Sequence, residues 1–143
     1  MHATSHISID AGGVGRVAFD LSHEQFAAAR VAASAACTER HRDQAMTVDD
    51  VLAMRRLSAI CDQLDALAGS GLADTVELTV AGLALLHDAL VEWVDAREAQ
   101  GWMREQDHAT HRLVLPLVRE LGDLRARAVQ VALAGEPLAA ATV

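Results

Sequence analysis

The sequence contains no lysine, no asparagine and no tyrosine, and its aromatic side chains are two phenylalanines and two tryptophans. Alanine supplies much of the hydrophobic content, which is 52% of the 143 residues. Small side chains let helices approach one another closely, whereas binding pockets for small molecules are usually lined by hydrophobic and aromatic side chains. The composition therefore favours a domain of closely packed helices over one with an aromatic-lined pocket.

Positive charge is also scarce, because all twelve basic residues are arginines and the formal net charge is −8. The arginines form small clusters, such as Arg55 with Arg56 and Arg125 with Arg127, and not a stripe. Domains that bind nucleic acid or anionic membrane surfaces usually present a basic face. The charge therefore argues against nucleic acid and against a membrane surface as partners.

Long apolar runs and export signals are missing as well. No run reaches the roughly 20 apolar residues that a membrane-spanning helix needs. Met1–Asp10 has neither the charged start nor the apolar segment of a secretory signal. Cys37 and Cys61 do not form a CxxC pair, and in a reducing compartment we expect buried thiols and no disulfide. These features predict a cytoplasmic protein.

The hydrophobic pattern predicts a mostly α-helical α+β fold. Four long segments have helical periodicity, over about residues 22–42, 47–68, 79–100 and 103–133. Apolar and polar residues alternate at 7–9, 17–21 and 75–78, which is typical of short strands. We expect a four-helix bundle-like domain with a small sheet, formed by an N-terminal β-hairpin and one short strand. The length suits a single domain over 1–143, with loose termini at 1–6 and 136–143.

Two helix starts are marked by capping boxes. Ser22 is followed three residues later by Gln25, and Thr47 is followed three residues later by Asp50. In such a box the two side chains bond reciprocally to each other's backbone N–H groups at the first turn of a helix. We therefore expect helices to begin directly after Ser22 and Thr47.

The helices 79–100 and 103–133 are expected to form the centre of the fold. Gly101 is a stop signal between them, and so short a link makes them antiparallel neighbours. Pro116 cannot donate a backbone hydrogen bond, which predicts a kink or a break in the second of these helices. The Gly–Glu–Pro sequence at 135–137 is expected to end it.

Helical spacing divides both helices into faces. The core face of helix 79–100 is expected to be Leu83, Leu86, His87, Leu90, Trp93, Val94 and Arg97. Its acidic, solvated face is Asp88, Glu92, Asp95 and Glu98. The main apolar stripe of helix 103–133 is Ala109, Leu113, Leu117, Leu121, Leu124, Ala128 and Val131. His87 is expected to be a neutral core histidine bonded to backbone or to a carboxylate.

A second stripe on helix 103–133 is the candidate partner surface. It consists of His108, His111, Leu115, Val118 and Gly122, well away from the main stripe. A monomer with one core does not need both stripes, and adjacent exposed aliphatic side chains indicate an interface. We therefore predict that the second stripe contacts a partner, most simply a second copy in a homodimer. The alternative is that helix 22–42 covers Leu115 and Val118 inside a monomer.

A faint internal repeat runs through the chain. A strand at 17–21 is followed by two helices, and a strand at 76–80 is followed by two more. Leucines in the second helix of each set correspond roughly, with an offset that drifts by one residue. The pattern indicates a possible strand–helix–helix duplication, although any two amphipathic helices align on leucines.

A metal site is the chemical alternative to a partner surface. His108 and His111 are three residues apart, so both imidazoles can lie on one side of a helix. Glu92 and Asp95 pass near the same height in an antiparallel hairpin, and carboxylates with histidines in a helical bundle bind zinc or iron. Against this, no HExxH motif is present, and both carboxylates are on the polar face of their helix.

These features lead to one function and one alternative. The leading interpretation is a non-catalytic protein-interaction or regulatory module that acts as a homodimer and uses no cofactor. The alternative is a metal-binding helical-bundle enzyme or sensor that uses His108 and His111. Metal analysis of protein purified without a histidine tag would separate the two.

Overall fold

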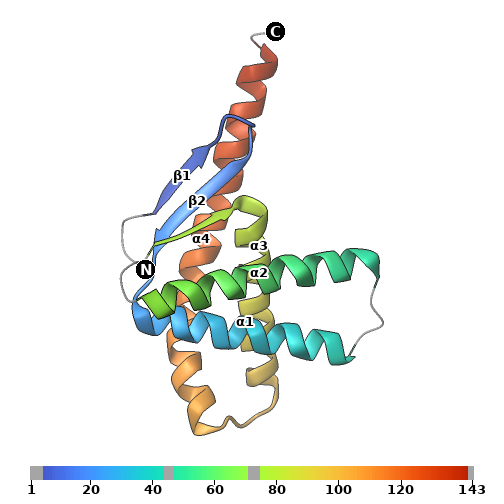
Figure 1. Cartoon of the computed structure of the whole chain (residues 1–143), viewed down its shortest axis with the longest axis vertical. Coiled ribbons are helices and arrows are strands. Elements are labelled where there is room, and N and C mark those ends of the chain that lie inside the picture. The colour runs from blue at the N-terminus through green and yellow to red at the C-terminus, as the bar shows by residue number, and fades with distance from the viewer. Residues whose placement is uncertain (1–4, 44–46, 71–74, 142–143) are drawn as a thin grey trace.

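The structure is a computed structural model that describes residues 5–43, 47–70 and 75–141. Within these ranges three strands and four helices follow one another along the chain (Figure 1). Their bounds are β1 (His6–Ile9), β2 (Gly15–Asp20), α1 (His23–Asp43), α2 (Val48–Ser70), β3 (Thr75–Thr79), α3 (Val80–Ala99) and α4 (Glu105–Ala141). The mostly α-helical α+β class with a small sheet is confirmed.

The helices form two antiparallel hairpins, α1 with α2 and α3 with α4, and Figure 1 shows the first hairpin lying across the second. The order strand–helix–helix occurs twice, as β2–α1–α2 and as β3–α3–α4. The two strands that begin these units are antiparallel neighbours in the sheet. The element order therefore agrees with the faint repeat in the sequence.

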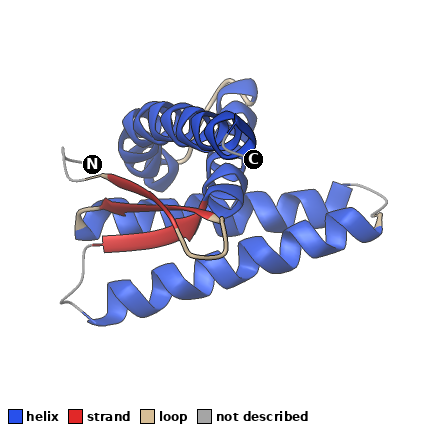
Figure 2. Ribbon diagram, turned by 90° about the horizontal axis from the view of Figure 1, so that it is seen from above, coloured by secondary structure: helices blue, strands red, loops and turns tan. Residues whose placement is uncertain are grey.

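The sheet, drawn in red in Figure 2, is antiparallel, in the order β1–β2–β3. Val17 lies opposite Leu78, and Phe19 lies opposite Val76. All four of these side chains are buried, at 5% exposure or less. Because side chains alternate between the two faces of a strand, one face of the sheet packs on the helices and the other is polar.

The turn between β1 and β2 is organised by Asp10. One carboxylate oxygen, Oδ1, accepts hydrogen bonds from the Gly12 and Val14 N–H groups at 2.9 and 3.0 Å. The other, Oδ2, accepts from Arg16 Nε at 3.0 Å. The Arg16 hydrogen bond is the main cause that lowers the pKa of Asp10. Gly13 has a φ of +80°, a conformation that glycine adopts at no steric cost.

Both predicted capping boxes are present. The Ser22 N–H donates to Gln25 Oε1 at 2.9 Å, and the Gln25 N–H donates to Ser22 Oγ at 3.1 Å. The Thr47 N–H donates to Asp50 Oδ2 at 3.0 Å, and the Asp50 N–H donates to Thr47 Oγ1 at 3.2 Å. The local sequence therefore sets where α1 and α2 begin.

The structure corrects two expectations about α4. Of the kink or break predicted at Pro116, the break does not occur, and the helix does not end at 135–137 but continues to Ala141. Pro116 has no N–H to donate to the Arg112 carbonyl. Both residues are exposed, so water can hydrogen-bond to that carbonyl instead. Val114 and Leu117 are fully buried, and their packing holds the helix in place. At 135–137, glycine and proline weaken a helix without forbidding it.

The centre of the fold is the crossing of α1 and α3, and not the α3–α4 hairpin that the sequence predicts. Each of these two helices contacts the other three. The buried alanines of α1 are Ala28, Ala29, Ala32, Ala33 and Ala36, all at 5% exposure or less. They include more than the single inner face that helical spacing suggests, because α1 is covered on more than one side.

None of the helices in the described ranges combines the length and the apolar character that crossing a bilayer requires.

Candidate functional site

Two residues of the second stripe of α4, His111 and Gly122, lie against α3. His111, whose side chain is 17% exposed, has its Nε2 3.1 Å from Glu98 Oε1. Its ring centroid is 6.4 Å from that of Trp93. At the other end, a Cβ placed on Gly122 would lie 3.1 Å from His87 Nε2. Both contacts are within one chain, so His111 and Gly122 have intramolecular roles.

The middle of the stripe is only partly covered. Leu115 and Val118 are half-buried and pack against the hydrophobic core, while His108 is exposed. The predicted dimer contact through this stripe therefore stays a prediction, and the surface that it offers is smaller than the sequence suggests. A helix in a hairpin buries a second face against its neighbour, which accounts for the second stripe without a partner.

The four residues of the predicted metal set are not brought together. Glu92 forms an ion pair with Arg40 of α1, and Asp95 is exposed. His111 instead contacts Glu98, one turn further along α3. Across the described ranges, no group of three or more histidine, cysteine, aspartate and glutamate side chains is placed to hold a metal ion.

His87 lies at the α3–α4 contact, half-buried as expected of a core-facing histidine. Arg125 Nη1 lies 3.1 Å from His87 Nδ1 and donates to Asp88 Oδ1 at 2.7 Å. Burial, and then the positive charge of Arg125, lower the pKa of His87, while Asp88 and a backbone hydrogen bond with Val118 act in the opposite direction. The net effect favours the neutral imidazole.

We expect the lowered pKa of His87 to make the fold less stable as the pH falls. The unfolded imidazole takes up a proton near its ordinary pKa of about 6.5, and the folded one takes it up only at lower pH. This contribution is therefore complete above pH ~6.5 and decreases as the pH falls toward the pKa of the folded state. Melting temperatures between pH 7.5 and 5 should fall less for His87→Gln than for wild type. Parallel curves for the two proteins would contradict this assignment.

Two ion pairs between α1 and α3 escaped the sequence analysis. Glu39 pairs with Arg97, and Arg40 pairs with Glu92. The Arg97 guanidinium also lies over the Trp93 ring, 5.6 Å from its centroid. Adjacent residues of opposite charge on α1 thus meet oppositely charged residues on α3, which fixes how the two hairpins cross. The sequence signal for these pairs is the dipeptide Glu39–Arg40 in one helix and the charged residues 92 and 97 in another. Matching them requires knowing that α1 and α3 cross, which the sequence does not show.

A groove between α2 and α3, bordered at one end by the sheet, has a lining that combines several elements. Two adjoining hollows, of about 530 and 380 Å³, share Arg56, Ala81 and Leu85. Both are open to solvent, their apolar lining includes Ile60, and the charged residues on their rims, such as Asp49, are of both signs. The arrangement is a shallow amphipathic groove and not an enclosed cleft in which reacting groups converge.

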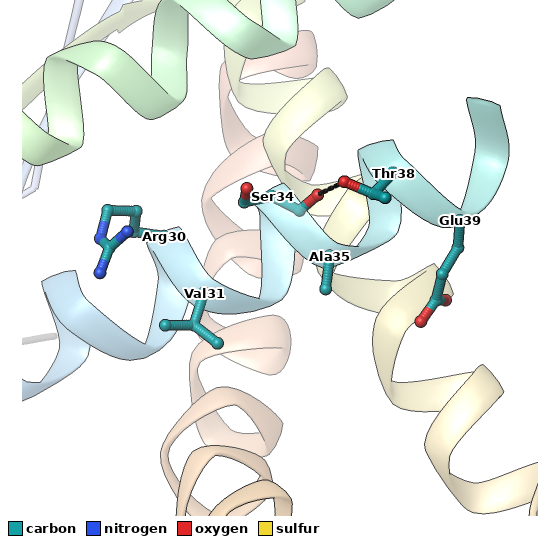
Figure 3. A pocket seen from close by; sticks show the side chains of 6 residues that line it. All are labelled: Arg30, Val31, Ser34, Ala35, Thr38 and Glu39. Atoms are coloured by element: carbon teal, nitrogen blue, oxygen red, sulfur yellow. Dashed lines mark hydrogen bonds between the residues drawn. The ribbon is translucent and has the colours of Figure 1, made fainter. Parts of the chain in front are cut away.

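A second shallow hollow, of about 430 Å³, lies on the outer face of α1 (Figure 3). Its charged residues already have partners, since Arg30 pairs with Asp65 of α2 and Glu39 pairs with Arg97. Thr38 Oγ1 donates to the Ser34 carbonyl at 3.1 Å within the helix. These polar groups therefore have partners within the chain and form contacts that stabilise the fold.

Exposed aliphatic side chains gather at the end of the molecule where α4 passes the sheet. Val129, Val131 and Leu133 are 41%, 40% and 58% exposed. Figure 1 shows β1 running beside this half of α4, and Arg127 Nη2 lies 3.3 Å from Ser5 Oγ at the start of the strand. Spacing assigns Val131 and Ala109 to the two ends of the core stripe, but both are exposed, so that prediction is wrong at both ends. The monomer covers the stripe from Leu113 to Ala128.

The two cysteines are free, and they are half-buried where the sequence predicts buried thiols. Burial is the main cause that raises the pKa of the Cys61 thiol. A raised pKa keeps the sulfur protonated and unreactive at neutral pH.

Comparison of the chain with protein-family models, with curated proteins and with solved structures gave no match.

Proposed function

We propose that this chain is a non-catalytic protein-interaction or regulatory module that acts as a homodimer in a reducing compartment, the cytoplasm. The free thiols of Cys37 and Cys61 and the protonated state favoured at Cys61 support the choice of compartment. The observation that carries the proposal concerns the main apolar stripe of α4. This stripe continues to Val131, whereas the rest of the monomer buries it only as far as Ala128.

Leu117, Leu121, Leu124 and Ala128 are at most 1% exposed, whereas Val131, the next position of the same stripe, is 40% exposed. Val129 and Leu133 add two more exposed aliphatic side chains on the same two turns. Single exposed aliphatics are ordinary, but several on one projecting helix end indicate a protein-binding surface. A second copy presents the same stripe, and a two-fold contact places like surfaces against each other.

The test is the mass of the protein in solution, measured by sedimentation over a range of concentrations. The chain has a mass of 15.2 kDa, and we expect a species of twice that mass. Val131→Glu combined with Leu133→Glu should give a folded monomer, because the two side chains lie on opposite sides of α4 and any partner of this segment would meet a carboxylate. Gln130→Glu, between them on the same exposed turn, is the control and should remain a dimer.

The outcomes separate the possible surfaces. A wild type that is monomeric at high concentration would contradict the proposal. A dimer that survives the 131/133 substitutions but becomes a folded monomer with Leu115→Glu and Val118→Glu would move the contact to the second stripe of α4. Circular dichroism of each variant distinguishes a folded monomer from an unfolded chain.

A further inference from the structure

In the part of the chain that the structure describes, one edge of the sheet lies next to a helix and the other has no further strand beside it. At the β3 edge, Gln63 of α2 donates from Nε2 to the Glu77 carbonyl at 3.1 Å. At the other edge, β1 pairs with β2 alone. The residues of β1 are His–Ile–Ser–Ile, without the lysine, proline or bulge that protects many edge strands from pairing.

The register shows which backbone groups of β1 point outward. Opposite residues in an antiparallel pair alternate between those that exchange backbone hydrogen bonds and those that do not. Asp10 and Val14 are a bonded pair, because the Asp10 N–H donates to the Val14 carbonyl at 3.0 Å. Counting back along the ladder, Ser8 bonds to β2, while Ile7 and Ile9 direct their N–H and C=O groups to the open edge.

The opposite edge gives the same alternation independently. The Glu77 carbonyl is turned outward toward Gln63, so the pair that Glu77 forms with Ala18 is an unbonded one. The backbone groups of Ala18 therefore point to β1, where they meet His6. A bonded pair at His6 again leaves Ile7 with its N–H and C=O facing outward.

We propose that two copies of this chain join through β1, antiparallel and centred on Ser8, to form a continuous sheet of six strands, three from each copy. This inference rests on the proposed homodimer and names its contact. In this register Ile7 of each copy lies opposite Ile9 of the other, so the four outward N–H groups meet the four outward C=O groups. The edge is therefore complementary to itself, which a two-fold contact requires.

The side chains agree with the same register. Ile7 and Ile9 lie on the helix face of the sheet, and Ile9 is 46% exposed. Each isoleucine would be covered by its symmetry mate, close to the exposed end of α4. On the polar face, His6 would lie opposite Asp10 of the second copy, where an imidazole N–H can donate to the carboxylate. Cross-strand pairs of both kinds stabilise antiparallel sheets.

The test is a disulfide between the two copies of residue 8, in protein with Cys37→Ala and Cys61→Ala. In an unbonded antiparallel pair the Cα atoms are about 4.5 Å apart, within the range of about 4.4–6.8 Å that a disulfide requires. Ser8→Cys should therefore form a covalent dimer under mild oxidation that dithiothreitol reverses. Ser8 is exposed, so the substitution leaves the monomer fold intact.

His6→Cys is the matched control, since it is also an exposed side chain on the same face of β1. In the proposed register the two copies of residue 6 are four positions apart along the ladder, or about 14 Å, too far for a disulfide. We expect Ser8→Cys to cross-link on the order of tenfold faster than His6→Cys. Equal rates in a protein that sediments as a dimer would overturn the β1 contact and leave the homodimer standing, whereas a monomeric wild type would remove both.

Ile9→Pro provides a second measurement. The Ile9 N–H points to the open edge, so proline removes an intermolecular hydrogen bond without removing one to β2. The variant should be a folded monomer. Ser8→Pro, which loses a bond to β2, should instead destabilise the hairpin. An Ile9→Pro protein that remains a dimer, with the wild-type circular dichroism spectrum, would contradict the proposal. A wild-type chain that does not pair with itself and binds only a different protein would also contradict it.

Discussion

Replacing Trp93 by alanine is expected to lower the free energy of unfolding by about 3–5 kcal/mol, as truncation of a buried tryptophan does. Trp93 is 1% exposed and is the largest of the fully buried side chains, in a core whose other aromatic members are Phe19 and Phe26. Its ring contacts Arg97 on its own helix and His111 on α4. Removing the indole leaves a cavity between α3 and α4. It also removes the cation–π contact between the ring and the Arg97 guanidinium.

The chain offers its own control in Trp102, which is 67% exposed in the link between α3 and α4. Trp102→Ala should change stability by no more than about 0.5 kcal/mol, because surface substitutions rarely do more. Denaturant unfolding followed by far-ultraviolet circular dichroism measures both variants without depending on tryptophan emission. Similar losses for the two would show that Trp93 does not fill the core, and Trp93→Phe, which keeps most of the volume, should lose less than Trp93→Ala.

Replacing Ala32 by glutamate is expected to cost about 3–5 kcal/mol, comparable to leaving a buried charge without its partner. Ala32 has no exposed surface, and no polar or charged residue belongs to the buried core in the ranges that the structure describes. The new carboxylate would have to be protonated or drawn out to solvent, and either response disturbs the crossing of α1 with its neighbours. The loss should be smaller at acid pH, where the carboxyl group is neutral.

Ser34→Glu is the matched control, two residues along the same helix at an exposed position. Both variants place the same side chain in α1, so their difference reports burial and not helix propensity. Melting curves should separate them clearly. If Ala32→Glu were as stable as Ser34→Glu, α1 would bury only the single face that its periodicity suggests, and the crossing of α1 and α3 would not be the centre of the fold.

Much of the local structure follows from the sequence. The capping boxes at Ser22 and Thr47 and the stop at Gly101 mark element ends, because hydrogen bonds and backbone dihedral angles within one turn decide them. The five apolar residues of the core face predicted for α3 are buried, its two polar members, His87 and Arg97, are half-buried, and all four residues of the acidic face are exposed. The strand alternation is equally reliable, since a strand that packs on helices with one face has a two-residue period.

The candidate site depended on tertiary structure to a much greater degree. His111 and Gly122 face α3 of their own chain, and the exposed aliphatic residues lie further along the helix, at Val129, Val131 and Leu133. Periodicity tells which residues of a helix share a face. It does not tell how many faces the neighbouring helices cover, nor how far along its length a helix is covered.

The sequence by itself determined the elements, the starts of α1 and α2, the end of α3, the apolar side of α3 and the mostly helical class, because each depends on contacts within a few residues. Only the tertiary structure decided that α1 and α3 form the centre, that Ala28 and Ala32 are buried together with Ala29 and Ala33, and that β1 is the open edge of the sheet. Alanine explains the difference for α1, since its small side chain is compatible with burial and with exposure alike. Strand order explains it for β1, because the partner of an edge strand is set by the path of the whole chain.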